Sequence, residues 1–483
     1  MNILSPAISL VSWLFRKSGS TVQAVQNHTC LTLNERSLPG KSPFLPAFVS
    51  ACLRGTTFSY RVIDQSVLNL INMKYLLILI FAFSMHPGSA QDLARFTVKP
   101  IPGAGTSPVS VPLDGINHNT DQGRIALFEA GPGQKEVPAQ LETGPQARLW
   151  FLFDHSGTEK SYIIRRVEGN TAQRGAVAIR QTEQGTTISR LEKPVMTYVH
   201  AEVFPPEGVD AKFRRSAFIH PLWSPEGEVL TRIQPPDHYH HYGIWNPWTK
   251  TTISGREVDF WNLYKGQGTV KFGGYLNAVQ GPVYAGFAVL QEHVFFAERG
   301  REKVAMNEVW DVRVWESADK AISVVDLTST LNTPLPEGIM LDAYRYGGGI
   351  GFRATEKWHK DNCSVLTSEG KSRAEADGSN ARWCIVEGES SGKSGRSGIL
   401  FLSHPSNRMH PEPMRVWPLD GNGGRGDMFF EFCPIRHNDW QLLPGNNYTL
   451  KYRMVVFDGK MTPEEAEKHW KAFASAPGVV FVN

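Results

Sequence analysis

The sequence has few cysteines, little net charge and no long apolar run. Only 5 of its 483 residues are cysteines, and no two stand in the CxxC spacing that redox and zinc sites use. The formal net charge is +3, and the basic excess is confined to the first 90 residues, so the main body is not expected to bind nucleic acid. The apolar run Tyr75 to Phe83 is shorter than the ~20 residues of a membrane span, and no stable membrane span is expected.

Several catalytic motifs are also missing. The sequence contains no GxSxG, no P-loop and no HExxH, so it offers no evidence for the hydrolases and nucleotide-binding enzymes that these motifs indicate. Gly421 to Gly426 satisfies GxGxxG, but the apolar residues Met428 to Phe432 that follow indicate a strand. A dinucleotide site requires a helix there, so none is predicted.

The positive N-terminal region contains the pattern of a signal peptide. Met73-Lys74 precedes the apolar run, and Gly88-Ser89-Ala90 offers a cleavage site before Gln91. We therefore expect a signal peptide over 73–90, an upstream extension over 1–72 that is not part of the fold, and export to the periplasm or the extracellular space. The alternative is a genuine N-terminal arm with a buried apolar strand at 75–83. N-terminal sequencing of exported material distinguishes the two.

Beyond Phe96 the apolar residues mostly alternate with polar ones, which favours an all-β protein. The clearest segment is 448–457, where Tyr452 and Met454 share an apolar face and Lys451 and Arg453 project from the other. Further strands are predicted at 148–153, 161–165, 321–327 and 398–402.

The domain organisation follows from the same patterns. A small β-sandwich is predicted over 91–185 and a large two-sheet sandwich over 186–460, with a C-terminal helix and tail over 461–483. Thr462, Pro463 and Glu465 form the capping box that begins this helix. Three cysteines follow residue 90 (Cys363, Cys384 and Cys433), enough for one disulfide, although Cys384 stands in an apolar strand typical of a buried thiol.

The densest chemistry lies between residues 235 and 246. Asp237, His238, His240 and His241 fall within five residues. Imidazole exchanges protons near neutral pH and a neighbouring carboxylate fixes its tautomer, so this segment predicts a general acid/base pair. The structural alternative is a strand entry whose histidines satisfy buried backbone groups.

A metal site is a second interpretation of these histidines. In an extended chain only His238 and His240 share a face, and a third ligand would have to come from His220 or Glu308. No cofactor is therefore favoured, although a transition metal remains an alternative, and we expect less than one equivalent of metal in purified protein. A tight turn at Tyr239 would overturn this argument by bringing all three imidazoles together.

Two other clusters are candidates for substrate binding. Arg345, Tyr346 and Arg353 lie in a glycine-rich segment, where arginines hold substrate oxygens by forked hydrogen bonds or pair with structural carboxylates. His404 and Asn407 follow the strand 398–402, where a polar turn is the alternative.

Residues 220–248, HPLWSPEGEVLTRIQPPDHYHHYGIWNPW, resemble a block of secreted bacterial proteins called the PmoA-like family. Further blocks agree in order over about 190–460, including YGGGIGFR, GILFLSHPSN and LPGNNYTLKYRMVVFDG. The resemblance implies a secreted β-sandwich protein of poorly defined function, common in carbohydrate-degrading bacteria. The His-His-x-Gly block is also faintly similar to galactose mutarotase-like sandwiches, which use a histidine with a carboxylate. Tyr242 stands where the PmoA-like block often has arginine, which weakens any argument for an anionic substrate there.

These observations predict a carbohydrate-active enzyme, an epimerase, lyase or hydrolase, acting on a sugar or glycoside. His240 or His241 is expected to be the general acid/base, Asp237 its orienting carboxylate and Arg353 a clamp on substrate oxygens. The expected substrate-binding residues are His220, Trp245, Arg345, Tyr346, His404 and Asn407, with Trp245 and Tyr346 as a stacking wall. A non-catalytic carbohydrate-binding protein and a metal-dependent enzyme with a His-rich site are the alternatives.

Overall fold

The computed structural model describes residues 91–168, 175–297 and 301–482, together with four strands between residues 21 and 60. The chain divides into two compact units, Met1–Ser89 and Ala90–Asn483. In the first unit, the strands pair antiparallel in the order β1-β2-β3-β4; they are β1 (Thr21–Asn27), β2 (Cys30–Arg36), β3 (Val49–Arg54) and β4 (Thr57–Tyr60). The expected signal peptide over 73–90 lies outside the described residues.

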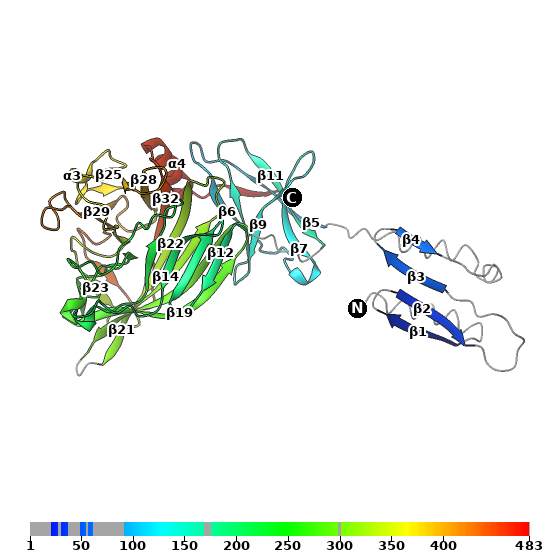
Figure 1. The fold of residues 1–483 in the computed structure, drawn as a ribbon, viewed down its shortest axis with the longest axis horizontal. Helices are drawn as coiled ribbons and strands as arrows, with labels where there is room; N and C mark the ends of the chain where they lie inside the picture. Colours follow the sequence, from blue (N-terminus) through cyan, green and yellow to red (C-terminus); the bar gives the residue numbers. More distant parts are fainter. Residues whose placement is uncertain are drawn as a thin grey trace, which may run out of the picture. The chain divides into compact units, whose positions relative to one another are not determined.

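The second unit begins with a small β-sandwich, whose strands β5–β11 are drawn in cyan in Figure 1. Its sheets have the orders β6-β10-β9 and β33-β5-β11-β7-β8, and alternate residues such as Phe96, Phe151 and Tyr162 pack between them. The strands are β5 (Gln91–Val98), β6 (Ser107–Pro112), β7 (Arg124–Glu129), β8 (Glu136–Val137), β9 (Ala139–Glu142), β10 (Arg148–Phe153), β11 (Lys160–Val167) and β33 (Val479–Val482). The C-terminal strand β33 pairs with β5, which the sequence pattern did not predict.

The large domain is built on two extended antiparallel sheets. One has the order β12-β13-β14-β15-β16-β24-β30-β29-β26. Its strands are β12 (Val177–Gln181), β13 (Gly185–Arg190), β14 (Lys193–Val199), β15 (Phe218–Leu222), β16 (Ile244–Trp245), β24 (Gly351–Arg353), β26 (Asn380–Ala381), β29 (Glu412–Val416) and β30 (Phe429–Phe432). Because β12 and β13 belong to this sheet, the predicted boundary between 185 and 186 lies too far along the chain.

The other large sheet has the order β19-β20-β21-β22-β32-β28-β27-β25 and supplies the long green strands of Figure 1. Its strands are β19 (Gly268–Gln280), β20 (Tyr284–Phe296), β21 (Glu302–Trp315), β22 (Ile322–Asn332), β25 (Cys363–Thr367), β27 (Trp383–Glu389), β28 (Arg396–Ser403) and β32 (Tyr448–Asp458). A four-stranded sheet, β18-β17-β23-β31, adds β17 (Thr251–Ile253), β18 (Arg256–Val258), β23 (Ile339–Leu341) and β31 (Trp440–Leu442).

One hydrophobic core lies between the large sheets. Tyr198 and Phe352 contribute to it from the nine-stranded sheet, and Trp310 and Met454 from the eight-stranded sheet. This arrangement confirms the all-β fold and the large two-sheet sandwich that the alternation predicted.

Helices are few in the described part of the second unit. The predicted C-terminal helix is present as α4 (Pro463–Ala474), which begins with the expected capping box and lies beside β28. A single turn, α3 (Arg373–Ala376), and the 3₁₀ segments η1 (Thr120–Gln122), η2 (Ala211–Phe213) and η3 (Leu263–Lys265) complete the elements. None of the helices among the described residues has the length and apolar character to cross a membrane.

The three cysteines of the second unit are all buried and free. The disulfide that their number allowed is therefore not formed. Burial raises the pKa of the Cys363 thiol to about 12, and burial likewise raises that of Cys384. Both are inert thiols inside the sandwich, as the sequence context of Cys384 predicted.

Candidate functional site

The segment between Ile233 and Tyr242 folds into two consecutive tight turns. The His238 N–H donates to the Pro235 carbonyl at 2.8 Å, and the His241 N–H donates to the His238 carbonyl at 3.0 Å. An antiparallel bridge between Ile233 and Tyr242 closes the base of the loop. The extended conformation expected from the sequence is therefore wrong here, because the second of two prolines presets the backbone for the first turn.

The two turns bring three imidazoles together. One ring nitrogen from each of His238, His240 and His241 lies within 4.8 Å of the others, and we call these residues the histidine triad. The expectation that only His238 and His240 converge is wrong, because turns rather than strand alternation set the side-chain directions. His220, one of the expected third ligands, is not part of this group, and its Nδ1 lies 2.8 Å from the Thr231 hydroxyl.

His241 is the most enclosed member of the triad. Its side chain is 1% exposed, and neither ring nitrogen has a hydrogen-bond partner among the described residues. The ring stacks on Trp261 at a centroid distance of 5.4 Å and also packs against Trp245 and Phe429. Burial lowers the pKa of His241 well below its usual value, so the imidazole is neutral. Buried polar atoms are nearly always partnered, so this ring is prepared for a ligand.

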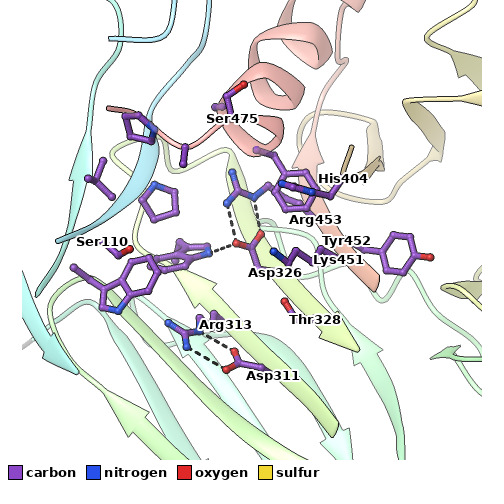
Figure 2. A pocket seen from close by; sticks show the side chains of 18 residues that line it. Ser110, Asp311, Arg313, Asp326, Thr328, His404, Lys451, Tyr452, Arg453 and Ser475 are labelled. Atoms are coloured by element: carbon purple, nitrogen blue, oxygen red, sulfur yellow. Dashed lines mark hydrogen bonds and ion pairs between the residues drawn. The ribbon is translucent and has the colours of Figure 1, made fainter. Parts of the chain in front are cut away.

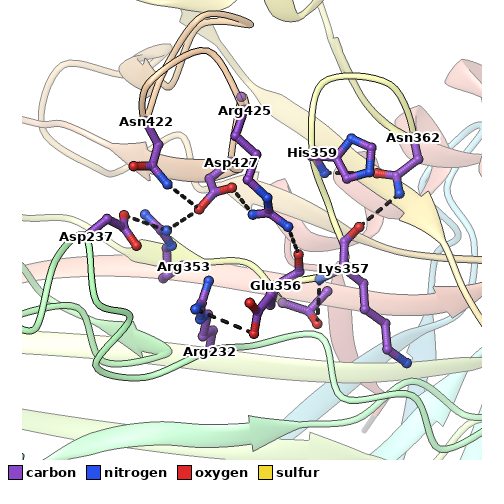
Figure 3. A network of polar contacts seen from close by, with 12 residues as sticks. Arg232, Asp237, Arg353, Glu356, Lys357, His359, Asn362, Asn422, Arg425 and Asp427 are labelled. Atoms are coloured by element: carbon purple, nitrogen blue, oxygen red, sulfur yellow. Dashed lines mark hydrogen bonds and ion pairs between the residues drawn. The ribbon is translucent and has the colours of Figure 1, made fainter.

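His238 is held from behind by a carboxylate. Its Nδ1 lies 2.8 Å from Asp237 Oδ2, which leaves Nε2 available on the other side of the ring. Asp237 Oδ2 also accepts from Arg353 at 2.8 Å, and Arg353 donates to Asp427 at 2.7 Å (Figure 3). Burial opposes the charge of Asp237, but the His238 hydrogen bond and the Arg353 charge outweigh it and lower the carboxyl pKa to about 2.

His240 completes the triad on the side of Trp261. Burial, together with the charge of His238, lowers the pKa of His240 to about 3. At neutral pH both His240 and His241 are therefore unprotonated. An imidazole of this kind is a poor proton donor near pH 7, so the lowered pKa values do not favour the predicted general acid role.

The triad can hold a metal ion. Neutral imidazole nitrogen is a ligand for zinc, copper, iron and nickel. In a tetrahedral site with zinc–nitrogen bonds of about 2.0–2.1 Å the nitrogens stand about 3.3–3.4 Å apart, so the three would close inward by about 0.9 Å at most. A carboxylate behind a ligating histidine is the usual support for such a site, and Asp237 occupies that place behind His238.

The family model of DUF6807, described as a family of unknown function, matches residues 185–471. This is more than half of the 483-residue chain. The chain belongs to this family. A search among curated proteins gave no match. The DUF6807 region contains the histidine triad, Asp237 and Arg353 but not the strands β5–β11 of the small sandwich.

Other residues predicted for the site lie near the triad within the DUF6807 region. Trp245 is 0% exposed and packs against His241, so it does not offer a face to a sugar and its expected stacking role is wrong. Tyr346 is half-buried, with its ring 5.2 Å from Trp261. Arg345 is exposed, and its guanidinium lies over the Tyr346 ring at 5.4 Å. Arg345 and Tyr346 therefore both lie close to the aromatic residues around the triad.

His404 and Asn407 do not join the triad. Asn407 is buried and donates to Glu412 at 2.9 Å and to the Lys451 carbonyl at 2.8 Å. The His404 ring packs edge-on against Phe473 of α4 at 5.2 Å. The buried Asn407 amide is therefore satisfied by neighbouring groups, as in the polar turn that the sequence analysis gave as the structural alternative.

Two residues that the sequence analysis missed complete the surroundings of the triad. Trp417 packs against His238 at 4.9 Å and lies under the Arg353 guanidinium at 4.7 Å. Asp427 gives Arg353 its second carboxylate. Trp417 precedes the glycine-rich loop 421–426 and Asp427 follows it. An acidic residue next to the apolar run 428–432 was the feature of the sequence from which Asp427 could have been identified.

Proposed function

We propose that this protein is an exported metal-dependent enzyme in which His238, His240 and His241 bind a transition metal ion. The observation that carries the proposal is His241, a buried neutral imidazole with both nitrogens unbonded beside two further imidazoles. Leaving such a ring without partners costs about 1–3 kcal/mol. A metal ion offsets that cost and explains why three histidines stand together.

The unequal exposure of the His238 and His241 rings supports a catalytic rather than a structural role for the proposed metal ion. The His238 side chain is 34% exposed, so the triad has one side open to solvent while His241 closes the other. Three protein ligands with an open position are typical of catalytic zinc sites, whereas structural sites use four. When bound, such an ion supplies Lewis-acid polarisation of a substrate oxygen.

The surrounding residues position the triad. Asp237 fixes the tautomer of His238 through Nδ1, so that Nε2 carries the free lone pair. Arg353 holds Asp237 in place and is itself 1% exposed between two carboxylates. Trp261 and Trp417 pack around the rings and exclude water from their inner side.

For the substrate, we propose a carbohydrate or glycoside. The support is the resemblance of residues 220–248 to a family of secreted proteins common in carbohydrate-degrading bacteria. Tyr346 and Arg345 lie next to the aromatic cluster around the triad and would contact this substrate. The alternative is a non-catalytic carbohydrate-binding protein, for which we expect sugar binding without turnover.

The first test is elemental analysis of protein purified without chelator. We expect about one metal ion per chain, the reverse of the expectation from an extended strand, and loss of that ion in His238→Ala, His240→Ala and His241→Ala. His437→Ala is the matched control, because His437 is exposed and lies outside the triad. Wild-type protein that neither contains metal nor takes it up on dialysis would contradict the proposal.

The second test separates enzyme from binding module. Wild-type and His240→Ala protein are compared on a panel of aryl glycosides and uronides, with and without added metal. Turnover that requires both the metal and His240 supports the enzyme. Metal-independent sugar binding without turnover on the whole panel would favour the binding module instead.

A further inference from the structure

A cavity of about 410 Å³ lies on the outer face of the eight-stranded sheet. Its floor comes from β21, β22 and β32, and its sides from β6 and β10 of the small sandwich and from the end of α4 (Figure 2). No member of the histidine triad lines it. Its volume is within the range of small-molecule sites, and three separate parts of the chain build it.

The floor of the cavity carries a row of charges fixed across three strands. Arg313 stands opposite Asp326 in the sheet register, and Asp326 stands opposite Arg453. Arg453 donates to both oxygens of Asp326 at 2.6 and 2.8 Å, and Trp315 donates to the same carboxylate at 2.8 Å. These groups are rigid hydrogen-bonding surfaces, because each is held by its neighbours.

The next row has a cation without a partner. Asp311 stands opposite Thr328, and Thr328 stands opposite Lys451. Arg313 is occupied by Asp311 and by Glu142, at 2.8 and 2.9 Å. Among the described residues, no ion pair or side-chain hydrogen bond is made by the Lys451 ammonium, which is half-buried in the cavity lining. The floor therefore offers one free positive charge.

Aromatic side chains form the apolar part of the lining. Trp150 from the small sandwich and Phe473 from α4 are half-buried, and Trp315 lies 5.4 Å from Trp150. His404 also lines the cavity, and burial, reinforced by the charge of Lys451, lowers its pKa to about 4. It is therefore a neutral hydrogen-bonding group, and Lys451 remains the unpaired charge.

We propose that this cavity binds a sugar that carries a carboxylate, such as a hexuronate at the end of an acidic oligosaccharide. Arg313 and Arg453 lie over the Trp150 and Phe473 rings at 5.0 and 4.8 Å, and the apolar side of the pyranose packs against the parts of these two rings that the guanidinium groups leave uncovered. Asp326 and Thr328 accept and donate hydrogen bonds to hydroxyls, and the carboxylate pairs with Lys451. This site is independent of the metal centre, so either can exist without the other.

The test is a titration of the full chain with galacturonate and galactose, which differ only in the carboxylate at C6. Binding is followed by calorimetry up to about 10 mM ligand, where weak sites remain measurable. We expect galacturonate to bind at least tenfold more tightly than galactose. In Lys451→Met that preference disappears, whereas in Lys320→Met, which removes an exposed lysine outside the cavity, it is retained.

A second variant tests the aromatic part of the cavity. Phe473→Ala weakens both sugars, and circular dichroism and the melting temperature establish that the variant is folded. The His240→Ala variant keeps galacturonate binding, which distinguishes this site from the metal centre. The proposal is wrong if galacturonate does not saturate the protein, if both sugars bind equally, or if Lys451→Met leaves the preference intact.

Discussion

Two histidine-containing loops of the large domain differ in whether their buried polar side chains have hydrogen-bond partners. In the loop that carries the triad, His241 is buried and its ring nitrogens bond to nothing. In the loop after β28, the buried Glu412 accepts from Ser403, Asn407 and Tyr452. The sequence analysis offered both loops as candidates, the first with the denser chemistry, yet among the described residues only the first leaves the ring nitrogens of a buried histidine without a partner.

The difference shows that composition alone does not identify a site. A loop whose buried polar atoms satisfy one another needs no partner from outside the chain. A loop that buries an unsatisfied imidazole raises that free energy, and it requires a partner from outside the chain. The predictions below test this contrast, beginning with the largest effect.

The largest effect is expected at the enclosed ring of the triad. His241→Ala should weaken metal binding more than about 100-fold, because removing a ligand exceeds the 10–100-fold cost of removing its supporting residue. Competition with a chromogenic chelator measures the affinity. An affinity close to that of wild type would show that His241 is not a ligand and that its burial is purely structural.

The second effect concerns pH and the satisfied loop. Burial raises the pKa of Glu412 to about 7, against the opposing hydrogen bond from Ser403. The pKa of Glu412 in the folded protein exceeds the ordinary carboxyl value. Its contribution to the free energy of unfolding is therefore fully present below pH 4.5, and it falls by about 3 kcal/mol as the pH rises to about 7. Glu412→Gln should remove that loss. Urea unfolding between pH 4.5 and 8 checks it, and a profile parallel to wild type would contradict it.

The third effect is at the carboxylate behind the triad. Asp237→Asn keeps the size of the side chain but removes the charge that orients His238 and pairs with Arg353. We expect metal affinity to fall 10–100-fold while one ion still binds at saturation. Isothermal titration with zinc measures both quantities. An unchanged affinity would mean that Asp237 serves only to neutralise Arg353.

The smallest effect is expected in the second loop. His404→Ala should change metal affinity less than about twofold, because His404 lies beside α4 and not in the triad. The same titration used for Asp237→Asn checks this. A large loss of metal affinity in His404→Ala would show that the second loop also contributes to metal binding, contrary to this comparison.

Regular elements were predictable from the sequence because local rules determine them. The alternation over 448–457 corresponds to β32, and 148–153 coincides with β10. The capping box at Thr462 correctly located the start of α4. In each case one face meets the core or one side chain caps a backbone group, and neither depends on distant residues.

The site was only half predictable. Sequence proximity correctly indicated that Asp237 and the histidines lie close together, but the alternation rule failed because hydrogen bonds from His238 and His241 form turns. Trp417 and Asp427 reach the triad from far along the chain, through pairing of β30 with β24. Such long-range register depends on the whole sheet and leaves no local trace in the sequence.

The pairing of β33 with β5 has a consequence for how the protein is made. The small sandwich is translated before the DUF6807 region, yet its five-stranded sheet lacks an edge strand until Val479–Val482 arrives. Until then the β5 edge is open to other strands. The small sandwich is therefore completed only after the DUF6807 region, which separates β33 from the other strands of its sheet along the chain.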